Sequence, residues 1–285
     1  MNNGVIIKGM DANHTIAFPV YTCIVPALLS GLSFLAAVSL IAFIWCYELP
    51  SRQQEAVENG ELNEHVDAFN PFNVLTFLAF VSGGFHFAVV AYYNFKSRES
   101  SIMETLHIFS LSVVESIYLS LSWVRSRDIL TLQASHPIQV LLKVLTLSSP
   151  IIFTLPTLLE LISTDTASPA TTTASTLTNW LFYLLDATFL VFYIRFSIRF
   201  TRGESPNPTT HSLTIITKYS IVGSLCILAA AVTATFTSAF HTRNDLWFVA
   251  VTTQEVFAFL CGCVLCGMKV ALVVWKRLDR MDSMR

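Results

Sequence analysis

Charged side chains are scarce in this chain of 285 residues. Asp, Glu, Lys and Arg make up 13% of it, against roughly 25% in a typical soluble domain. There is also no glycine-rich phosphate loop, no nucleophile and base at catalytic spacing, and no basic cluster long enough for nucleic acid. These absences argue against a soluble enzyme and a nucleic-acid-binding protein, and we expect that the protein is not an enzyme.

Cysteine is absent from every segment that we expect to be a loop. The spacing of Cys261, Cys263 and Cys266 does not put zinc ligands on one helix face, so no metal site is expected. Together with Gly262 and Gly267 they are small residues that let a second helix approach closely. The six cysteines, all within apolar segments, are Cys23, Cys46, Cys226, Cys261, Cys263 and Cys266.

Hydrophobic residues make up 53% of the chain, and they gather in seven apolar segments of about 20 residues or more, the length that crosses a bilayer as a helix. Alternating ten-residue strands are absent, so a barrel is not expected. We predict an all-α bundle of seven transmembrane helices forming a single domain over residues 1–285. The protein would be a multi-pass integral protein of the plasma membrane or an endomembrane. The expected segments are Pro19–Tyr47, Phe72–Phe95, Thr105–Val124, Pro137–Ile162, Leu177–Phe200, Ser212–Phe240 and Leu246–Trp275.

The distribution of Lys and Arg predicts an orientation, because basic residues favour the cytoplasmic side. The side that holds the C-terminus carries nine of them, and the side that holds the N-terminus carries four. We therefore expect the N-terminus outside, and Asn13-His14-Thr15 is a glycosylation sequon on that side, at Asn13. The nine are Arg52, Arg125, Arg127, Arg199, Arg202, Lys276, Arg277, Arg280 and Arg285, and the four are Lys8, Lys96, Arg98 and Arg243.

The connectors differ in composition. Glu48–Pro71 is the longest and is acidic, so we expect it to be solvated. Ser163–Thr178 is rich in Ser, Thr and Ala and has no core-forming residues, which is typical of a flexible connector. The tail Lys276–Arg285 is short and basic.

Four ionisable residues inside the expected spans lie nine or ten positions from span ends on one side. At 1.5 Å per residue they would lie roughly 13–15 Å deep. Charged groups in lipid are costly and often functional, so we expect one shared polar cavity. The alternative is that each carboxylate bonds separately to Ser or Thr on a neighbouring helix. Glu160, Lys143 and Lys218 lie near span ends, where interfacial snorkelling explains them. The four are His86, Glu115, Asp186 and Glu255.

Lys269 lies in the last apolar segment, and two interpretations are open. The side chain could snorkel toward the basic tail. It could instead be a buried amine for Schiff-base chemistry, in which case it needs a carboxylate partner, for which Glu115 is the candidate. Counted from Leu246, Lys269 lies roughly 35 Å along its helix, about 20 Å beyond the level of Glu115.

Two parts of the sequence resemble the heliorhodopsins, seven-helix proteins that carry retinal on a last-helix lysine. The similar segments are Ser82-Gly83-Gly84-Phe85-His86-Phe87, Phe95-Lys96, Ser101-Ile102-Met103, Ile108-Phe109, Val114-Glu115-Ser116-Ile117-Tyr118 and Lys269-Val270-Ala271-Leu272 with Trp275. The resemblance implies retinal as cofactor on Lys269, Glu115 as counterion and His86 in the nearby polar pocket. It also implies a cytoplasmic N-terminus, opposite to the orientation that the basic residues predict.

Three functions remain open from the sequence. The first is a retinal photoreceptor that signals through light-driven helix rearrangement. The second is a receptor of the G-protein-coupled type, with an unknown extracellular ligand near Glu115, Asp186 and Glu255. The third is a proton or solute conductor. The expected partners are the lipid bilayer, a cytoplasmic signalling protein and a second copy of the chain. The second copy would be contacted through Gly262 and Cys266. Nucleic acid is not expected as a partner.

Overall fold

The computed structural model describes residues 12–51, 53, 70–95, 101–162, 169–201, 208–239 and 244–283. Within these residues, seven helices are long and apolar enough to cross a membrane. The all-α seven-helix prediction is therefore confirmed, and with it the character of an integral multi-pass membrane protein. The helices are α1 (Ala12–Phe43), α3 (Pro71–Phe95), α4 (Ser101–Gln133), α5 (His136–Ile162), α6 (Pro169–Thr201), α7 (Pro208–Ala239) and α8 (Asn244–Ser283). A single π-helical turn, η1 (Ile44–Glu48), continues α1.

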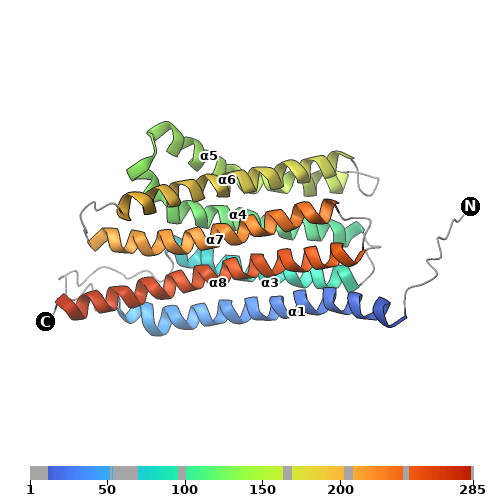
Figure 1. Ribbon diagram of the computed structural model, residues 1–285, viewed down its shortest axis with the longest axis horizontal. Coiled ribbons are helices and arrows are strands. Elements are labelled where there is room, and N and C mark those ends of the chain that lie inside the picture. Colours follow the sequence, from blue (N-terminus) through green and yellow to red (C-terminus); the bar gives the residue numbers. More distant parts are fainter. Residues whose placement is uncertain are drawn as a thin grey trace, which may run out of the picture.

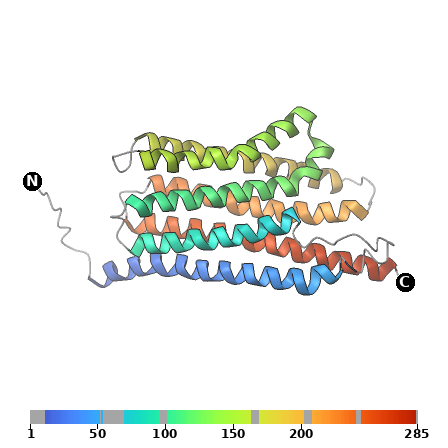
Figure 2. The same ribbon diagram turned by 180° about the vertical axis from the view of Figure 1, so that it is seen from behind.

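The helices run along one axis, and the start of α1 and the end of α8 lie at opposite ends of the bundle (Figures 1 and 2). Helices that follow each other in sequence are neighbours in space, and α8 returns to contact α1, which closes the ring. Helix α4 is the central element, because it contacts α3, α5, α6 and α7. Side chains on α4 can therefore reach most of the bundle.

Several helices extend beyond the apolar segments that predicted them, and three of them do so by eight or more residues at one end. Helix α4 ends at Gln133 and not at Val124, α6 begins at Pro169 and not at Leu177, and α8 passes Trp275 to end at Ser283. The connector expected to be flexible therefore begins α6, where Thr173 and Thr176 donate to carbonyls one turn back. Hydropathy marks the part of a helix in lipid, whereas backbone hydrogen bonds continue past it.

The first turn of α1 contains Asn13, the residue of the glycosylation sequon. Its modification stays a prediction.

Helix α5 runs continuously through two internal prolines, Pro150 and Pro156. Proline removes a backbone donor and bends a helix. The hydroxyl of Thr154 donates to the carbonyl of Pro150 at 2.8 Å, close to this weak point. Figure 1 shows the first part of α5 leaning away from the bundle.

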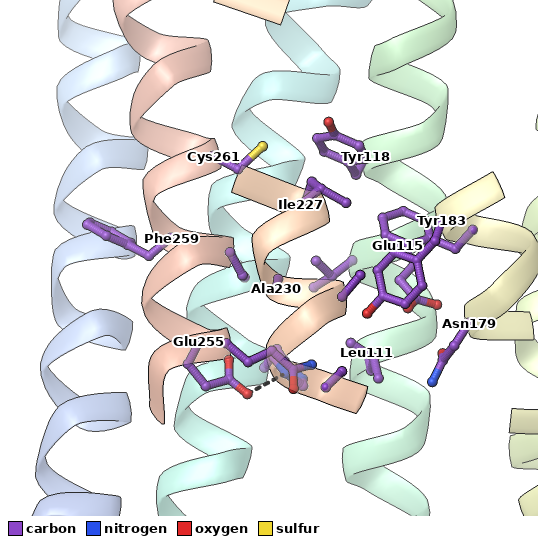
Figure 3. A pocket seen from close by; sticks show the side chains of 18 of the residues that line it. Leu111, Glu115, Tyr118, Asn179, Tyr183, Ile227, Ala230, Glu255, Phe259 and Cys261 are labelled. Carbon is purple, nitrogen blue, oxygen red and sulfur yellow. Dashed lines mark ion pairs between the residues drawn. The ribbon is translucent and has the colours of Figure 1, made fainter. Parts of the chain in front are cut away.

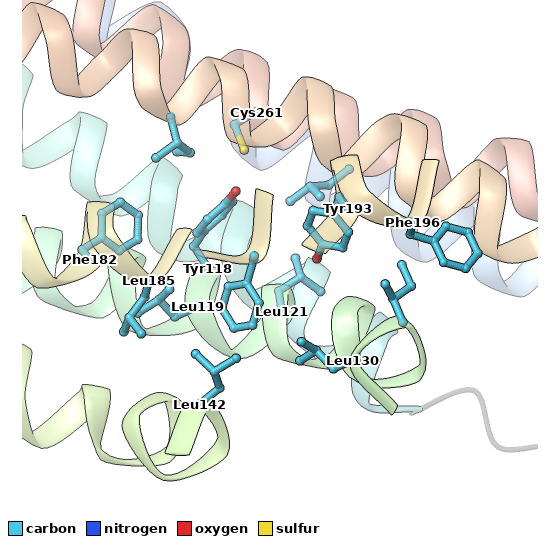
Figure 4. Packing of buried hydrophobic residues seen from close by; sticks show 14 of the residues in the cluster. Tyr118, Leu119, Leu121, Leu130, Leu142, Phe182, Leu185, Tyr193, Phe196 and Cys261 are labelled. Atoms are coloured by element: carbon cyan, nitrogen blue, oxygen red, sulfur yellow. The ribbon is translucent and has the colours of Figure 1, made fainter. Parts of the chain in front are cut away.

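The main hydrophobic core lies where α4 faces α6, with contributions from α5, α7 and α8 (Figure 4). Leu119, Leu121, Phe189 and Tyr193 are fully buried there. Large apolar side chains cover the outside of the bundle, as Leu35, Ile151 and Leu184 do. Such an apolar exterior is suited to lipid.

Small residues on α8 allow close helix contacts within the chain. A Cβ atom on Gly262 would lie 3.1 Å from the ring of Phe80, and one on Gly267 would lie 3.1 Å from Tyr219. Cys266 packs on the cluster where α1 meets α3. The close-packing interpretation is therefore confirmed for Gly262, Gly267, Cys261 and Cys266, whereas Cys263 is exposed. The same faces are therefore occupied, so Gly262 and Cys266 do not support a homodimer as we had expected.

Candidate functional site

A cavity of about 850 Å³ lies inside the bundle, lined by residues of α1, α3, α4, α6, α7 and α8. Its volume falls within the roughly 300–1,000 Å³ of small-molecule sites. Most lining side chains are apolar or aromatic, and the polar ones cluster in a few positions (Figure 3). This cavity is the candidate functional site, and we call it the central cavity.

The side chains of His86 and Glu255 lie within ion-pair distance of each other at one end of the central cavity, with Nε2 of His86 3.7 Å from Oε1 of Glu255. On the other side of the ring, Nδ1 lies 2.9 Å from the hydroxyl of Ser110. That hydroxyl also donates to the carbonyl of His107 at 2.9 Å. Contacts at both ring nitrogens therefore hold the orientation of the His86 ring.

Glu115 projects from α4 into the central cavity, beside Tyr183 (Figure 3). Its side chain is only 7% exposed. No residue in the described part of the chain forms a hydrogen bond or ion pair with it. A buried carboxylate without a partner is costly, so Glu115 is the group in this cavity that a ligand would satisfy.

Asp186 is fully buried but does not line the central cavity. Its Oδ1 accepts hydrogen bonds from Tyr118 at 3.0 Å and from Ser224 at 3.1 Å. The shared cavity that we expected therefore contains His86, Glu115 and Glu255, whereas Asp186 has separate partners. Tyr118 connects Asp186 to the central cavity, because it lines the cavity and donates a hydrogen bond to Asp186.

Arg125 is a buried residue that the sequence analysis missed. Its guanidinium donates to Ser122 at 2.7 Å and to Ser220 of α7 at 3.4 Å. It also lies 5.7 Å from the centre of the Tyr118 ring. We had counted Arg125 as a connector residue because the apolar segment ends at Val124. The serines spaced along α4 were the available signal, since they give a buried guanidinium its acceptors.

Lys269 lies near the C-terminal side of the bundle, in a buried cluster that we call the lysine cluster. Its Nζ is 2.6 Å from Oε2 of Glu48 and also donates to Oδ1 of Asn73. The amide of Asn73 donates to the same Glu48 oxygen at 3.3 Å. Lys269 is 4% exposed and Glu48 is 3% exposed. The pair is therefore enclosed by protein, between the end of α1, the start of α3 and the late part of α8.

This cluster corrects two expectations. Lys269 does not snorkel to the surface, and its carboxylate partner is Glu48, not Glu115. Glu48 was assigned to a solvated connector, but the π-helical turn η1 carries it inward. Lys269 does not line the central cavity, whereas Leu265, one turn earlier on α8, does.

No protein-family model, curated protein or solved structure matches this chain. The resemblance to heliorhodopsins therefore stays a prediction.

The lysine cluster predicts a non-additive effect on stability. Lys269→Met leaves Glu48 buried without its cation, so the free energy of unfolding should fall by about 3–5 kcal/mol. The double variant Lys269→Met/Glu48→Gln removes both charges and should recover most of that loss. Thermal unfolding in lipid nanodiscs measures both. Lys218→Met changes an exposed lysine and should stay within about 0.5 kcal/mol of the unmodified protein. A double variant no more stable than Lys269→Met would contradict the pairing.

Proposed function

We propose that this protein is a seven-helix membrane receptor that binds a small, mostly apolar ligand in the central cavity. The observation that carries the proposal is the cavity itself, which is large enough for a small molecule and apolar over most of its lining. Its polar groups are few and fixed, which is typical of a ligand site. The His86–Glu255 pair and Glu115 would orient a polar end of the ligand.

The position of the central cavity supports a receptor. Glu255, Thr176 and Asn179 line it, and they lie near the starts of α8 and α6, on the N-terminal side of the bundle. Basic residues such as Arg199 and Lys276 belong to the opposite side. With that basic side in the cytoplasm, the cavity lies in the outer half of the membrane, where an extracellular ligand arrives.

Tyr118 supplies a route by which a ligand could change the inner half of the bundle. It lines the cavity, donates to Asp186 on α6 and lies beneath Arg125, which bonds to Ser220 on α7. A ligand that moves Tyr118 would alter the contacts among three helices. A ligand shifts the balance between two conformations of a protein only if it binds one of them more tightly than the other.

The proposal predicts that an apolar probe binds in the central cavity. Octan-1-ol should bind to the protein in nanodiscs, as saturation-transfer NMR would show. Ala258→Trp places a large ring in the cavity lining and should remove most of this binding. Ala27→Trp adds the same ring on an exposed face of α1 and should leave it unchanged. If Ala258→Trp and Ala27→Trp bind octanol equally well, the octanol is only dissolved in the lipid, and that result would contradict the proposal.

Retinal is a second candidate ligand, and Lys269 is the observation that favours it. A buried amine beside a carboxylate fits a retinal attachment site, because a protonated imine in lipid needs a counter-charge. Glu48 and Asn73 would hold that charge, while Leu265 borders the apolar cavity that a polyene would occupy. Retinal would supply the absorption of visible light.

An absorption spectrum after addition of all-trans retinal tests this second candidate. A visible band should appear with the unmodified protein and be absent with Lys269→Ala. Glu48→Gln should shift or abolish the band because it removes the partner carboxylate, whereas Glu115→Gln should change it little. The absence of a band in the unmodified protein would leave Lys269 as a structural ion pair. A band that depends on Glu115 and not on Glu48 would overturn the role given to Glu48.

A further inference from the structure

A second, smaller cavity of about 340 Å³ lies between α4, α5 and α6, next to the central cavity. We call it the acidic cavity. The two cavities share Leu111, Glu115, Thr176 and Asn179, so they meet at the unpaired carboxylate of Glu115. The lining of the central cavity is mostly apolar, whereas that of the acidic cavity is mostly hydroxyl, amide and carboxylate groups.

Three carboxyl side chains line the acidic cavity, and His107 is the one imidazole among its described lining residues. Glu104 and Glu115 of α4 and Glu160 of α5 all contribute to it. Among the described residues that line either cavity, none is Lys or Arg. The space where the cavities meet therefore attracts cations and repels anions.

Two of these carboxylates are buried and have no partner within the described residues. Glu115 and Glu160 are each 7% exposed, and neither forms a hydrogen bond or ion pair there. Glu160 lies close to the C-terminal end of α5, where the helix dipole is negative and disfavours an anion. The snorkelling expected for Glu160 is therefore incorrect, and its burial leaves a carboxyl group in the cavity lining that no described residue satisfies.

The geometry favours an organic cation over a metal ion. No three His, Cys, Asp or Glu side chains among the described residues lie close enough together to hold a metal. An ammonium group has three donors, which suit carboxylates spaced around a cavity that also holds hydroxyls such as that of Ser175. An apolar chain attached to the ammonium would continue past Glu115 into the central cavity.

We infer, on the basis of the proposed function, that the ligand class is a lipophilic amine. Its apolar body lies in the central cavity, and its ammonium group lies in the acidic cavity between Glu115 and Glu160.

Octan-1-amine and octan-1-ol, which have the same chain length and differ in charge, test this inference in nanodiscs. The unmodified protein should bind the amine at least tenfold more tightly than the alcohol. Glu160→Gln should weaken binding of the amine at least tenfold and leave the alcohol unchanged. Asp128→Asn is the matched control, because Asp128 is an exposed carboxylate on α4 that lines neither cavity, and it should leave both affinities unchanged.

A second variant adds a negative charge to the acidic cavity where Glu160→Gln removes one, so the test stays decisive if Glu160→Gln does not fold. Ser175→Asp adds a carboxylate to the acidic cavity and should tighten binding of the amine severalfold without affecting the alcohol. If the alcohol binds in the central cavity and the amine binds no better, the inference is wrong and the proposed function stands. If Ala258→Trp reduces binding of neither probe, both are wrong.

Discussion

The absence of water from the hydrocarbon layer is the constraint on which the rest of this structure depends. A polar group there has to find its partner inside the protein or bear a large cost. Three of the buried carboxylates in the described residues have partners, and two have none. The partnered ones are Glu48 with Lys269, Asp186 with Tyr118 and Ser224, and Glu255 with His86. Oδ2 of Asp186 also has no hydrogen-bond partner in the described residues, but Asp186 lines neither cavity, so Glu115 and Glu160 are the strongest sign of a ligand.

The polar groups are arranged in layers along the bundle, and α4 connects them. It carries Glu115 at the junction of the two cavities, Tyr118 at the wall of the central cavity, and Arg125 further toward the C-terminal side. The lysine cluster is a separate group, because Lys269 lies outside the cavity lining. The proposed receptor function would use this combination of a cavity on the N-terminal side and a polar network in contact with it on the C-terminal side. Nothing in the arrangement specifically favours a conductor.

The sequence predicted those features that depend on a single helix, namely where each helix lies in the chain and how deep a residue lies along it. Seven apolar segments predicted seven helices, and counting along them placed His86, Glu115, Asp186 and Glu255 at one depth. Three of these four line the central cavity, and Asp186 does not. The partners of Glu48 and Lys269 could not be predicted, because they depend on helix register and on a π-helical turn that carries Glu48 inward. Arg125 and Glu160 were misplaced for a related reason. Hydropathy shows which segments lie in lipid, but it does not show which side chains face other helices or an internal cavity.

The central claim is that an acidic space inside the bundle is reached from the N-terminal side. Asn179 lines both cavities, so Asn179→Cys, in a variant without the six native cysteines, reports on that space. We would compare its rates of modification by the ethylammonium and ethylsulfonate methanethiosulfonates, which carry opposite charges. The account predicts at least tenfold faster reaction with the cationic reagent, from the N-terminal side only. Equal rates, or reaction from the C-terminal side, would contradict it.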